Sequence, residues 1–365
     1  MAILIPNYGW SQKTDCEQTI AHATEEFNAG HFYSIPAILN ECLKSFSREQ
    51  RQRAFLLLTQ TYLLLDDPIG AEKSFLEILW ANPEFIADEQ LHAIDIVYLS
   101  KRFTATPKFS WFVGAGSNVS PVRVILDIDV SMDFNKELKE YYSIRPGYHF
   151  GLGGEYSYND NIKIRVESDY LHTAYSNTLN YFEKDTKYFI DRQSWVSIPL
   201  YVSYADNIGK YRPYGYAGYS LSWLLNDRGS ITLKNVNGAG DETDIFEVQS
   251  PDLDFLDKRN KLNQSLIFGG GVKYKVGLDF IFAELRYSAG LKNIVKNLYG
   301  NYAYDPKSAE WIKTFDPTAE YAHVDDYFRL DNFSITFGFL RPLYKPRELK
   351  RARTKGVLRK MKKSK

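Results

Sequence analysis

A two-residue alternation of apolar and small or polar side chains constrains this chain more than any other feature. It begins after Pro107, where Phe109, Trp111 and Val113 alternate with small or polar residues. Successive side chains of a β-strand point to opposite faces, so such segments predict strands with one apolar face. The pattern recurs in about eight segments: residues 109–116, 148–158, 162–173, 195–204, 213–225, 266–276, 278–289 and 332–340.

The composition indicates what the apolar faces contact. No run of 18 or more apolar residues occurs and the mean hydropathy is −0.37, which argues against membrane-spanning helices. The chain nevertheless carries 27 Tyr, 23 Phe and 6 Trp, which is too rich in packing groups for a disordered protein. Transmembrane β-barrels combine these properties, because their strands alternate and aromatic rings gather at both membrane interfaces.

The connections between the expected strands alternate in length. Short links are expected at 159–161, 205–210 and 275–277, and long ones at 117–146, 174–194, 226–263 and 290–331. Outer-membrane barrels show this alternation between periplasmic turns and extracellular loops. We therefore predict an eight-stranded antiparallel transmembrane β-barrel over residues 106–344, and keep a soluble barrel as the alternative.

The residues before the barrel have a helical period. Over 15–105 the apolar residues recur at spacings of three and four, with breaks at Gly30, Pro68 and Pro83. Two helix pairs at tetratricopeptide offsets, one fair and one degenerate, and a capping helix from about 87 to 99 are expected. The alternative is an ordinary helical bundle. Residues 1–14 are either a signal-peptide remnant or an N-terminal arm.

Four short runs carry a resemblance to a known family. They are SIPLY at 197–201, RPYGYAG at 212–218, ELRY at 284–287 and GLKNI at 290–294. They resemble the outer-membrane β-barrel domain widespread in Bacteroidota, of which PorT-like type IX secretion accessories are members. The resemblance covers roughly residues 107–344 and implies location and topology more than role. A helical front and a basic tail are not standard in that family.

Charged residues inside the barrel are predicted from the same alternation. On segment 162–173 the charges lie opposite Ile162, Ile164 and Val166, so they point inward if those aliphatic residues meet lipid. In a narrow interior such charges are expected to pair, since an unpaired buried charge costs several kcal/mol. A selective pore is the alternative. The predicted interior ion pairs involve Glu155, Lys163, Arg165, Glu167, Asp169, Lys273, Lys275, Glu284 and Arg286.

A serine and a histidine on segment 162–173 are of the types that form catalytic pairs. Ser168 and His172 share the outward face near one rim of the barrel. Residues four apart along a strand stand roughly 13 Å apart, so the two side chains cannot meet without a bulge. No catalytic residue, metal site or cofactor is therefore expected.

The two cysteines are predicted to form a disulfide. If the first two helices are antiparallel about Gly30, then Cys16 and Cys42 come to the same end of the hairpin. An oxidising periplasm would allow them to join, and buried free thiols are the alternative.

The C-terminal residues form a basic tail. Residues 345–365 hold eleven basic residues against one acid, Glu348, whereas the helical region is net acidic. We expect this tail to bind a partner in the periplasm, and expect no nucleic acid partner because no aromatic residues interleave with the charges. The basic residues are Lys345, Arg347, Lys350, Arg351, Arg353, Lys355, Arg359, Lys360, Lys362, Lys363 and Lys365.

These expectations together favour a non-enzymatic protein anchored in the outer membrane. An even number of strands returns the chain to the side where it entered, so both termini are expected in the periplasm. The helical domain and tail would bind other envelope proteins, with peptidoglycan as a further candidate ligand, in a secretion or outer-membrane assembly machine. A small-solute porin or surface receptor and a lipid-modifying rim enzyme are the alternative functions.

Overall fold

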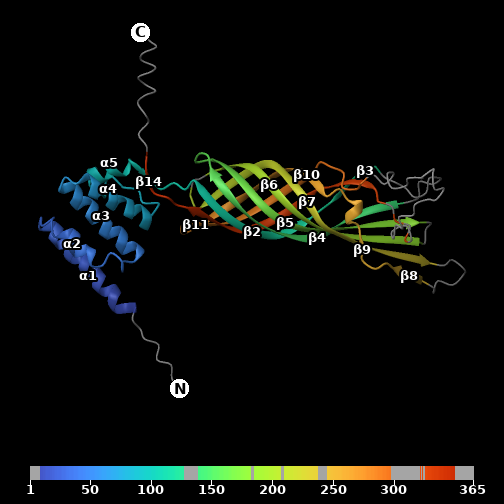
Figure 1. Ribbon diagram of the computed structural model, residues 1–365, viewed down its shortest axis with the longest axis horizontal. Coiled ribbons are helices and arrows are strands. Elements are labelled where there is room, and N and C mark those ends of the chain that lie inside the picture. The colour runs from blue at the N-terminus through green and yellow to red at the C-terminus, as the bar shows by residue number, and fades with distance from the viewer. Residues whose placement is uncertain are drawn as a thin grey trace, which may run out of the picture. The chain divides into compact units, whose positions relative to one another are not determined.

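The computed structural model describes residues 9–126, 139–181, 185–206, 209–236, 245–296, 321, 323 and 325–349. The chain divides into two compact units (Figure 1). The first contains Met1–Pro107 and Leu343–Lys365, and the second contains Lys108–Pro342. We call them the helical unit and the barrel unit, and each is described by itself.

The helical unit contains α1 (Gly9–Asn28), α2 (Ile35–Asn40), α3 (Arg48–Leu64), α4 (Pro68–Ala81) and α5 (Ile94–Ser100). Its caps follow from the sequence. Ser47 and Gln50 form a capping box at the start of α3, and Asp67 accepts the Gly70 N–H before Pro68 opens α4. No helix in the described part of the chain is long and apolar enough to cross a membrane.

The final helix of this unit is shorter than expected. The helix predicted over 87–99 begins only at Ile94 in the structure. Asn82 accepts the backbone N–H of Glu84, and Asp88 accepts that of Gln90. These local side-chain bonds stabilise turns in place of the first helical turns.

A disulfide joins the first two helices of the unit. Gly30 has a positive φ of 83° and lies in the connection after α1, where the chain turns back towards α2. Cys16 and Cys42 are bonded, with Cα atoms 5.6 Å apart. Cys16 is buried in one core with Ile20, Ile35 and Leu39. The bond therefore fastens α1 to the chain that follows α2.

The start of the predicted basic tail belongs to a small sheet of the helical unit. β1 (Phe103–Thr104) pairs antiparallel with β14 (Arg347–Glu348). Arg102 forms ion pairs with Glu348 at 2.8 Å and with Glu72 at 2.7 Å. The chain after the barrel thus returns to pair with the chain that precedes it.

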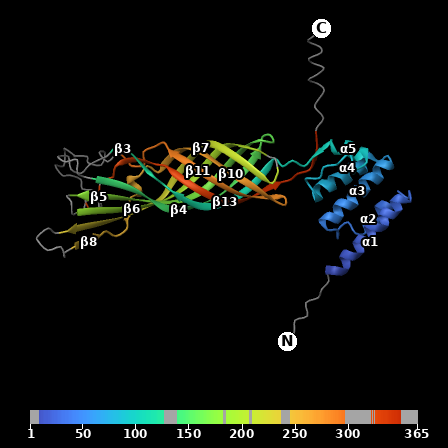
Figure 2. The same ribbon diagram turned by 180° about the vertical axis from the view of Figure 1, so that it is seen from behind.

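The barrel unit is a closed ring of eight long strands among the described residues. The order around the ring is β2-β4-β5-β6-β7-β10-β11-β13, and β13 neighbours β2 (Figures 1 and 2). The seven pairings from β2 round the ring to β13 are antiparallel. The strands are β2 (Phe109–Val119), β4 (Lys139–Ser157), β5 (Ile162–Tyr181), β6 (Asp185–Ala205), β7 (Tyr211–Val236), β10 (Leu262–Val276), β11 (Asp279–Gly290) and β13 (Asn332–Leu343).

The expected long connections are wrong in part, because several strands continue past the apolar alternation. The predicted connection 174–194 is almost entirely strand, with β5 and β6 paired from Ile162 with Tyr204 to Tyr181 with Asp185. Within 226–263, β7 continues to Val236 and meets β8 (Ile245–Gln249) and β9 (Leu253–Asp254). A 3-10 turn, η2 (Leu256–Lys258), follows. β3 (Val122–Leu126) pairs with β12 (Tyr327–Leu330).

A buried apolar cluster explains these extensions. Beyond the alternating part of the strands, side chains from β5, β6 and β7 pack against the segments that follow β8 and β11. This cluster gives the extended strands a core of their own. We call it the cap core; its buried members are Tyr175, Phe189, Trp195, Leu224, Ile231, Leu253, Phe255, Ile294, Val295 and Phe328.

Below the cap core, the outer wall of the barrel is apolar. Leu152, Leu200 and Phe337 are more than half exposed, although they are large hydrophobic residues. On the inner face of the wall, glycines make room for aromatic rings that fill the barrel. A Cβ at Gly269 would stand 2.4 Å from Tyr216 Cζ, and one at Gly338 would stand 2.3 Å from Phe282 Cζ.

Candidate functional site

The barrel lumen is filled by charged side chains. Near the end with the short turns, Glu155 on β4 is buried and contacts three cations. Its carboxylate accepts from Lys273 Nζ at 2.7 Å and from Lys163 Nζ at 3.1 Å, and Arg165 Nε lies at 3.9 Å. These partners come from β5 and β10, so closure of the ring is needed to bring them together.

A second layer is centred on Arg286 of β11. Its Nη2 donates to Glu167 at 2.8 Å and to Glu284 at 2.9 Å, and its Nη1 lies 3.5 Å from Asp169. Arg165 Nη1 contacts Glu284 at 3.2 Å and so joins the two layers. We call these eight residues, Glu155, Lys163, Arg165, Glu167, Asp169, Lys273, Glu284 and Arg286, the lumen network.

The lumen network is balanced in charge and embedded in rings. It holds four acids and four bases, so its formal charges cancel. Tyr201 donates to Glu167 at 2.8 Å and Tyr214 donates to Glu284 at 2.7 Å. The Arg165 guanidinium lies 4.1 Å from the centre of the Phe112 ring, a cation–π distance. Lys275, the ninth predicted residue, is half-buried near the end of β10.

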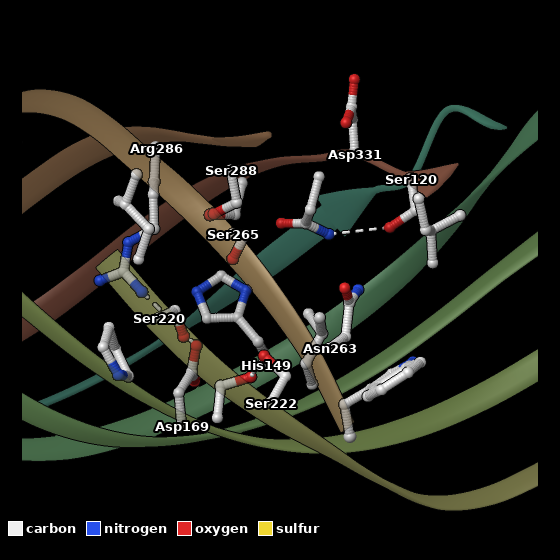
Figure 3. Close-up of a pocket in the computed structure, with 18 residues that line it drawn as sticks. Ser120, His149, Asp169, Ser220, Ser222, Asn263, Ser265, Arg286, Ser288 and Asp331 are labelled. Atoms are coloured by element: carbon white, nitrogen blue, oxygen red, sulfur yellow. Dashed lines mark hydrogen bonds and ion pairs between the residues drawn. The ribbon is translucent and has the colours of Figure 1, made fainter. Parts of the chain in front are cut away.

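A small polar chamber lies between Arg286 and the cap core (Figure 3). Its volume is about 60 Å³. Within the described part of the chain, Asp169 Oδ1 and His149 Nδ1 line this chamber without a hydrogen-bond partner. A polar cavity of this size suits ordered water. Its serine residues are Ser120, Ser197, Ser220, Ser222, Ser265, Ser288 and Ser334.

A second buried ion cluster, which the sequence did not predict, lies in the cap core. Arg259 is fully buried and contacts Asp227 at 2.8 Å, Asp325 at 2.9 Å and Asp191 at 3.0 Å. Tyr175 also donates to Asp191, at 2.5 Å. These residues lie in segments expected to be connections, and no local spacing links them, so no sequence signal pointed to the cluster. We call Arg259 and its three aspartates the cap ion cluster.

A comparison with known protein families agrees with the barrel geometry. Residues 101–296 match the family described as the outer membrane protein beta-barrel domain. The chain belongs to this family. The predicted outer-membrane barrel is therefore confirmed. No curated protein sequence matches the chain.

Solved structures similar to this outer membrane barrel share little sequence with it. Neisserial surface protein A is 15% identical, with a TM-score of 0.31, and the match covers 65% of this chain and 97% of that one. OprG of Pseudomonas aeruginosa is 10% identical, with a TM-score of 0.30 and coverage of 67% and 98%. The outer membrane enzyme PagL is 8% identical, with a TM-score of 0.23 and coverage of 64% and 99%.

On β6 the exposed apolar residues of the outer wall end before the cap ion cluster begins. On β6, Ile198, Leu200 and Val202 are exposed, whereas Asp191 lies past the buried Trp195. Asp191 and Asp227 of the cap ion cluster thus lie in the extensions of β6 and β7, past the apolar, lipid-facing part of β6.

The cap ion cluster shifts the titration of its members. Burial raises the pKa of Asp227 well above its usual range, and the Asp191 carboxylate adds to this against the opposing effect of Arg259. Burial also disfavours the ionised form of Asp325, but Arg259 and His323 outweigh it and hold the pKa of that carboxyl low. Burial lowers the pKa of His323. Protonation of Asp227 would reduce the excess negative charge of three carboxylates around Arg259.

The structure does not bring Ser168 and His172 together. Ser168 is exposed on the outer wall. His172 Nδ1 instead lies 3.1 Å from Ser194 Oγ on the neighbouring strand, and its ring stacks on Tyr148 with centroids 5.0 Å apart. This arrangement matches an aromatic belt residue at the rim.

Of the predicted basic tail, only the first residues can be located. Arg347 lies in β14, and Lys345 lies in the segment before it. Lys350, Arg351, Arg353, Lys355, Arg359, Lys360, Lys362, Lys363 and Lys365 lie outside the described residues.

Proposed function

We propose that this protein is a non-enzymatic adaptor or accessory subunit of an envelope machine, anchored by its barrel. The machine would act in protein secretion or outer-membrane protein assembly, as the resemblance to PorT-like barrels of Bacteroidota suggests. In this proposal the helical unit is tetratricopeptide-like and recognises other envelope proteins, with the basic tail as a second contact.

The observation that carries this proposal is an exposed apolar surface on the helical unit. Ile86, Leu91, Ile94 and Tyr98 are between 54% and 83% exposed. Ile94 and Tyr98 lie one turn apart on α5, and Leu91 precedes Ile94 by three residues. Ile86 and Leu91 adjoin Phe85 and His92, whose rings are in contact at 5.3 Å. We call these four residues the α5 patch.

The chemistry of the α5 patch suits a protein partner. Monomeric proteins rarely expose large apolar patches. Such a patch, when it is present, usually marks an interaction site. Lys101 lies 5.5 Å from the Tyr98 ring and 3.4 Å from Glu89, so charged residues border the patch. Such a rim around an apolar centre is typical of protein interfaces.

The filled lumen supports an anchoring role for the barrel over a transport role. The lumen network places buried side chains from β4, β5, β10 and β11 across the interior. The chamber of about 60 Å³ accommodates water rather than a nutrient. A porin or receptor for solutes therefore has less support than an anchor.

The proposed orientation follows from the ring. Eight strands return the chain to the barrel end where it entered, and the short turns lie at that end. Outer-membrane barrels keep short turns in the periplasm. Both termini would then be periplasmic, beside the partners that the proposal requires.

The test is affinity purification of the full chain from native membranes, with identification of co-eluting proteins. Ile94→Asp and Tyr98→Ser should each reduce recovery of the partner roughly tenfold or more, as expected when an interface anchor is lost. Tyr33→Ser is the matched control, because Tyr33 is 87% exposed on the same unit but outside the patch. Equal recovery with all three variants would refute the α5 patch as the recognition surface, and unchanged recovery with the barrel unit alone would refute the adaptor role.

A further inference from the structure

An apolar groove runs over the outer wall of the barrel on β10, β11, β13 and β2, which are neighbours in the ring. Its volume of about 600 Å³ falls within the roughly 300–1,000 Å³ of small-molecule sites. Its apolar sides include Phe268, Leu285, Phe333 and Ile335, which are 46% to 63% exposed. We call it the wall groove.

A missing side chain explains why the wall is hollow at this place. Gly270 lines the groove and pairs with Leu285 on β11 and with Gly215 on β7. Gly270 therefore leaves bare backbone in the groove beside the large apolar side chains of Phe268 and Leu285. A Cβ added to Gly270 would stand 3.2 Å from the nearest atom, Tyr214 O, so a side chain there needs only a small adjustment.

One end of the groove is polar. Tyr287, a lining residue, packs against Phe333 with ring centroids 4.5 Å apart, and its hydroxyl donates a hydrogen bond to Asp331 at 3.0 Å. Asp331 also accepts from Arg123 at 3.0 Å, and the Arg123 side chain is 48% exposed. Among the described residues both Arg123 contacts use Nη2, so the opposite side of this guanidinium can meet an anion.

We propose that the wall groove binds one acyl chain of lipid A, with a lipid phosphate at Arg123. The groove is continuous with the lipid-facing wall, so its natural occupant is an amphiphile from the bilayer. Its polar end lies at the barrel end away from the short turns, because β2 runs outward from Phe109 and Arg123 follows it. In the proposed orientation that end lies in the outer leaflet, where lipid A is the phosphate-bearing lipid. A guanidinium matches a phosphate oxygen pair in geometry and charge.

The experiment is native mass spectrometry of the full-length protein in detergent, titrated with bis-phosphorylated hexa-acyl lipid A. The wild-type protein should retain one lipid A per chain. Gly270→Leu fills the groove and should weaken retention roughly tenfold, which corresponds to about 1.4 kcal/mol. Gly154→Leu is the matched control, because Gly154 is exposed on the barrel wall outside the groove, and a Cβ there would meet no atom closer than 3.9 Å. This control should retain lipid A within about twofold of the wild type.

Two further arms separate the groove from general lipid contact. Arg123→Gln should lower retention of bis-phosphorylated lipid A several-fold while leaving lipid A without phosphates unchanged. Heat-dependent gel migration confirms that each variant is folded, and Gly270→Ala, which should have a smaller effect in the same direction, serves if Gly270→Leu does not fold. Equal losses in Gly270→Leu and Gly154→Leu, equal retention of phosphatidylglycerol and lipid A, or a co-purifying polypeptide in the groove would each overturn the proposal. None of these outcomes depends on the partner of the helical unit.

Discussion

Single charged residues buried in the barrel unit have large effects on its free energy of unfolding. Arg286 contacts Glu167, Asp169 and Glu284, and all four side chains are 10% exposed or less. Removing a partner from a buried ion pair leaves an uncompensated charge, which costs far more than the pair itself contributes. The lumen network is therefore sensitive to removal of one member and less sensitive to replacement of several.

We expect Arg286→Ala to destabilise the barrel by roughly 3–5 kcal/mol, because three buried carboxylates lose their shared cation. The measurement is urea unfolding in lipid vesicles, followed by gel migration. Arg341→Ala is the control, since Arg341 pairs with Asp279 at 2.8 Å but its side chain is 52% exposed. It should shift the midpoint little, because exposed pairs contribute little. Equal shifts for the two variants would contradict a buried network.

The cap ion cluster predicts a pH dependence with a defined sign. A group whose pKa is raised on folding contributes stability that is present at low pH and is lost as pH rises through its folded pKa. Burial raises the pKa of Asp227 from 3.8 to about 10, which predicts that the cap core loses stability from about pH 4 up to about pH 10.

Asp227→Asn imitates the protonated carboxyl and should remove this loss of stability with rising pH, which approaches about 1.4 kcal/mol per pH unit for one proton. Thermal unfolding midpoints of both proteins across neutral and alkaline pH provide the measurement. Tyr175→Phe is a useful comparison, because it removes a hydrogen bond to Asp191 but leaves the Asp227 carboxyl in place. Parallel pH profiles for the wild type and Asp227→Asn would exclude Asp227 as the titrating group.

At the scale of elements, short covalent and hydrogen-bonded links hold the helical unit together. The disulfide joins Cys16 in α1 to Cys42 just after α2, a sequence separation of 26, and β14 adds a strand from the chain that follows the barrel. Helices of six or seven residues such as α2 and α5 are marginal by themselves. The stability of these short helices therefore depends on the disulfide, on the β1–β14 pairing and on the packed cores.

Replacing Cys16 and Cys42 by serine should destabilise the helical unit by about 3 kcal/mol, the value expected for a loop of this size. Loss of helical circular dichroism on heating, with and without reductant, measures the effect. The strand signal of the barrel should keep its own transition. A wild-type melting curve that does not respond to reductant would argue against a stabilising bond.

The strands also show which part of the fold is determined by local sequence. All eight expected strands overlap observed ones, since alternation follows from strand geometry. The extensions of β5 and β6 were missed because Tyr175, Ser176 and Asn177 are all buried, so no alternating outer face marks them. Their burial comes from the cap core, whose members lie up to 153 residues apart in sequence, from Tyr175 to Phe328.

At the scale of the whole molecule, the filled lumen predicts a barrel closed to solutes. Protein reconstituted in planar bilayers should show no stable ohmic conductance, because an eight-stranded interior is only wide enough for side chains. Arg165→Ala with Glu284→Ala would enlarge the space beside Phe112 and serves to show that the assay detects an opened path. Steady conductance by the wild-type protein would instead favour the porin alternative.

The sequence by itself determined the outer-membrane barrel, the approximate positions of its eight strands and the inward side for the eight charges of the lumen network. These properties depend on neighbours one or two residues away, through the alternation of side chains along a strand. Tertiary structure decided which charges meet: Arg165 and Glu284 are 119 residues apart in the chain and 3.2 Å apart in the lumen. It also created the cap ion cluster and the wall groove, because ring closure sets which strands are neighbours, and no local pattern encodes that closure.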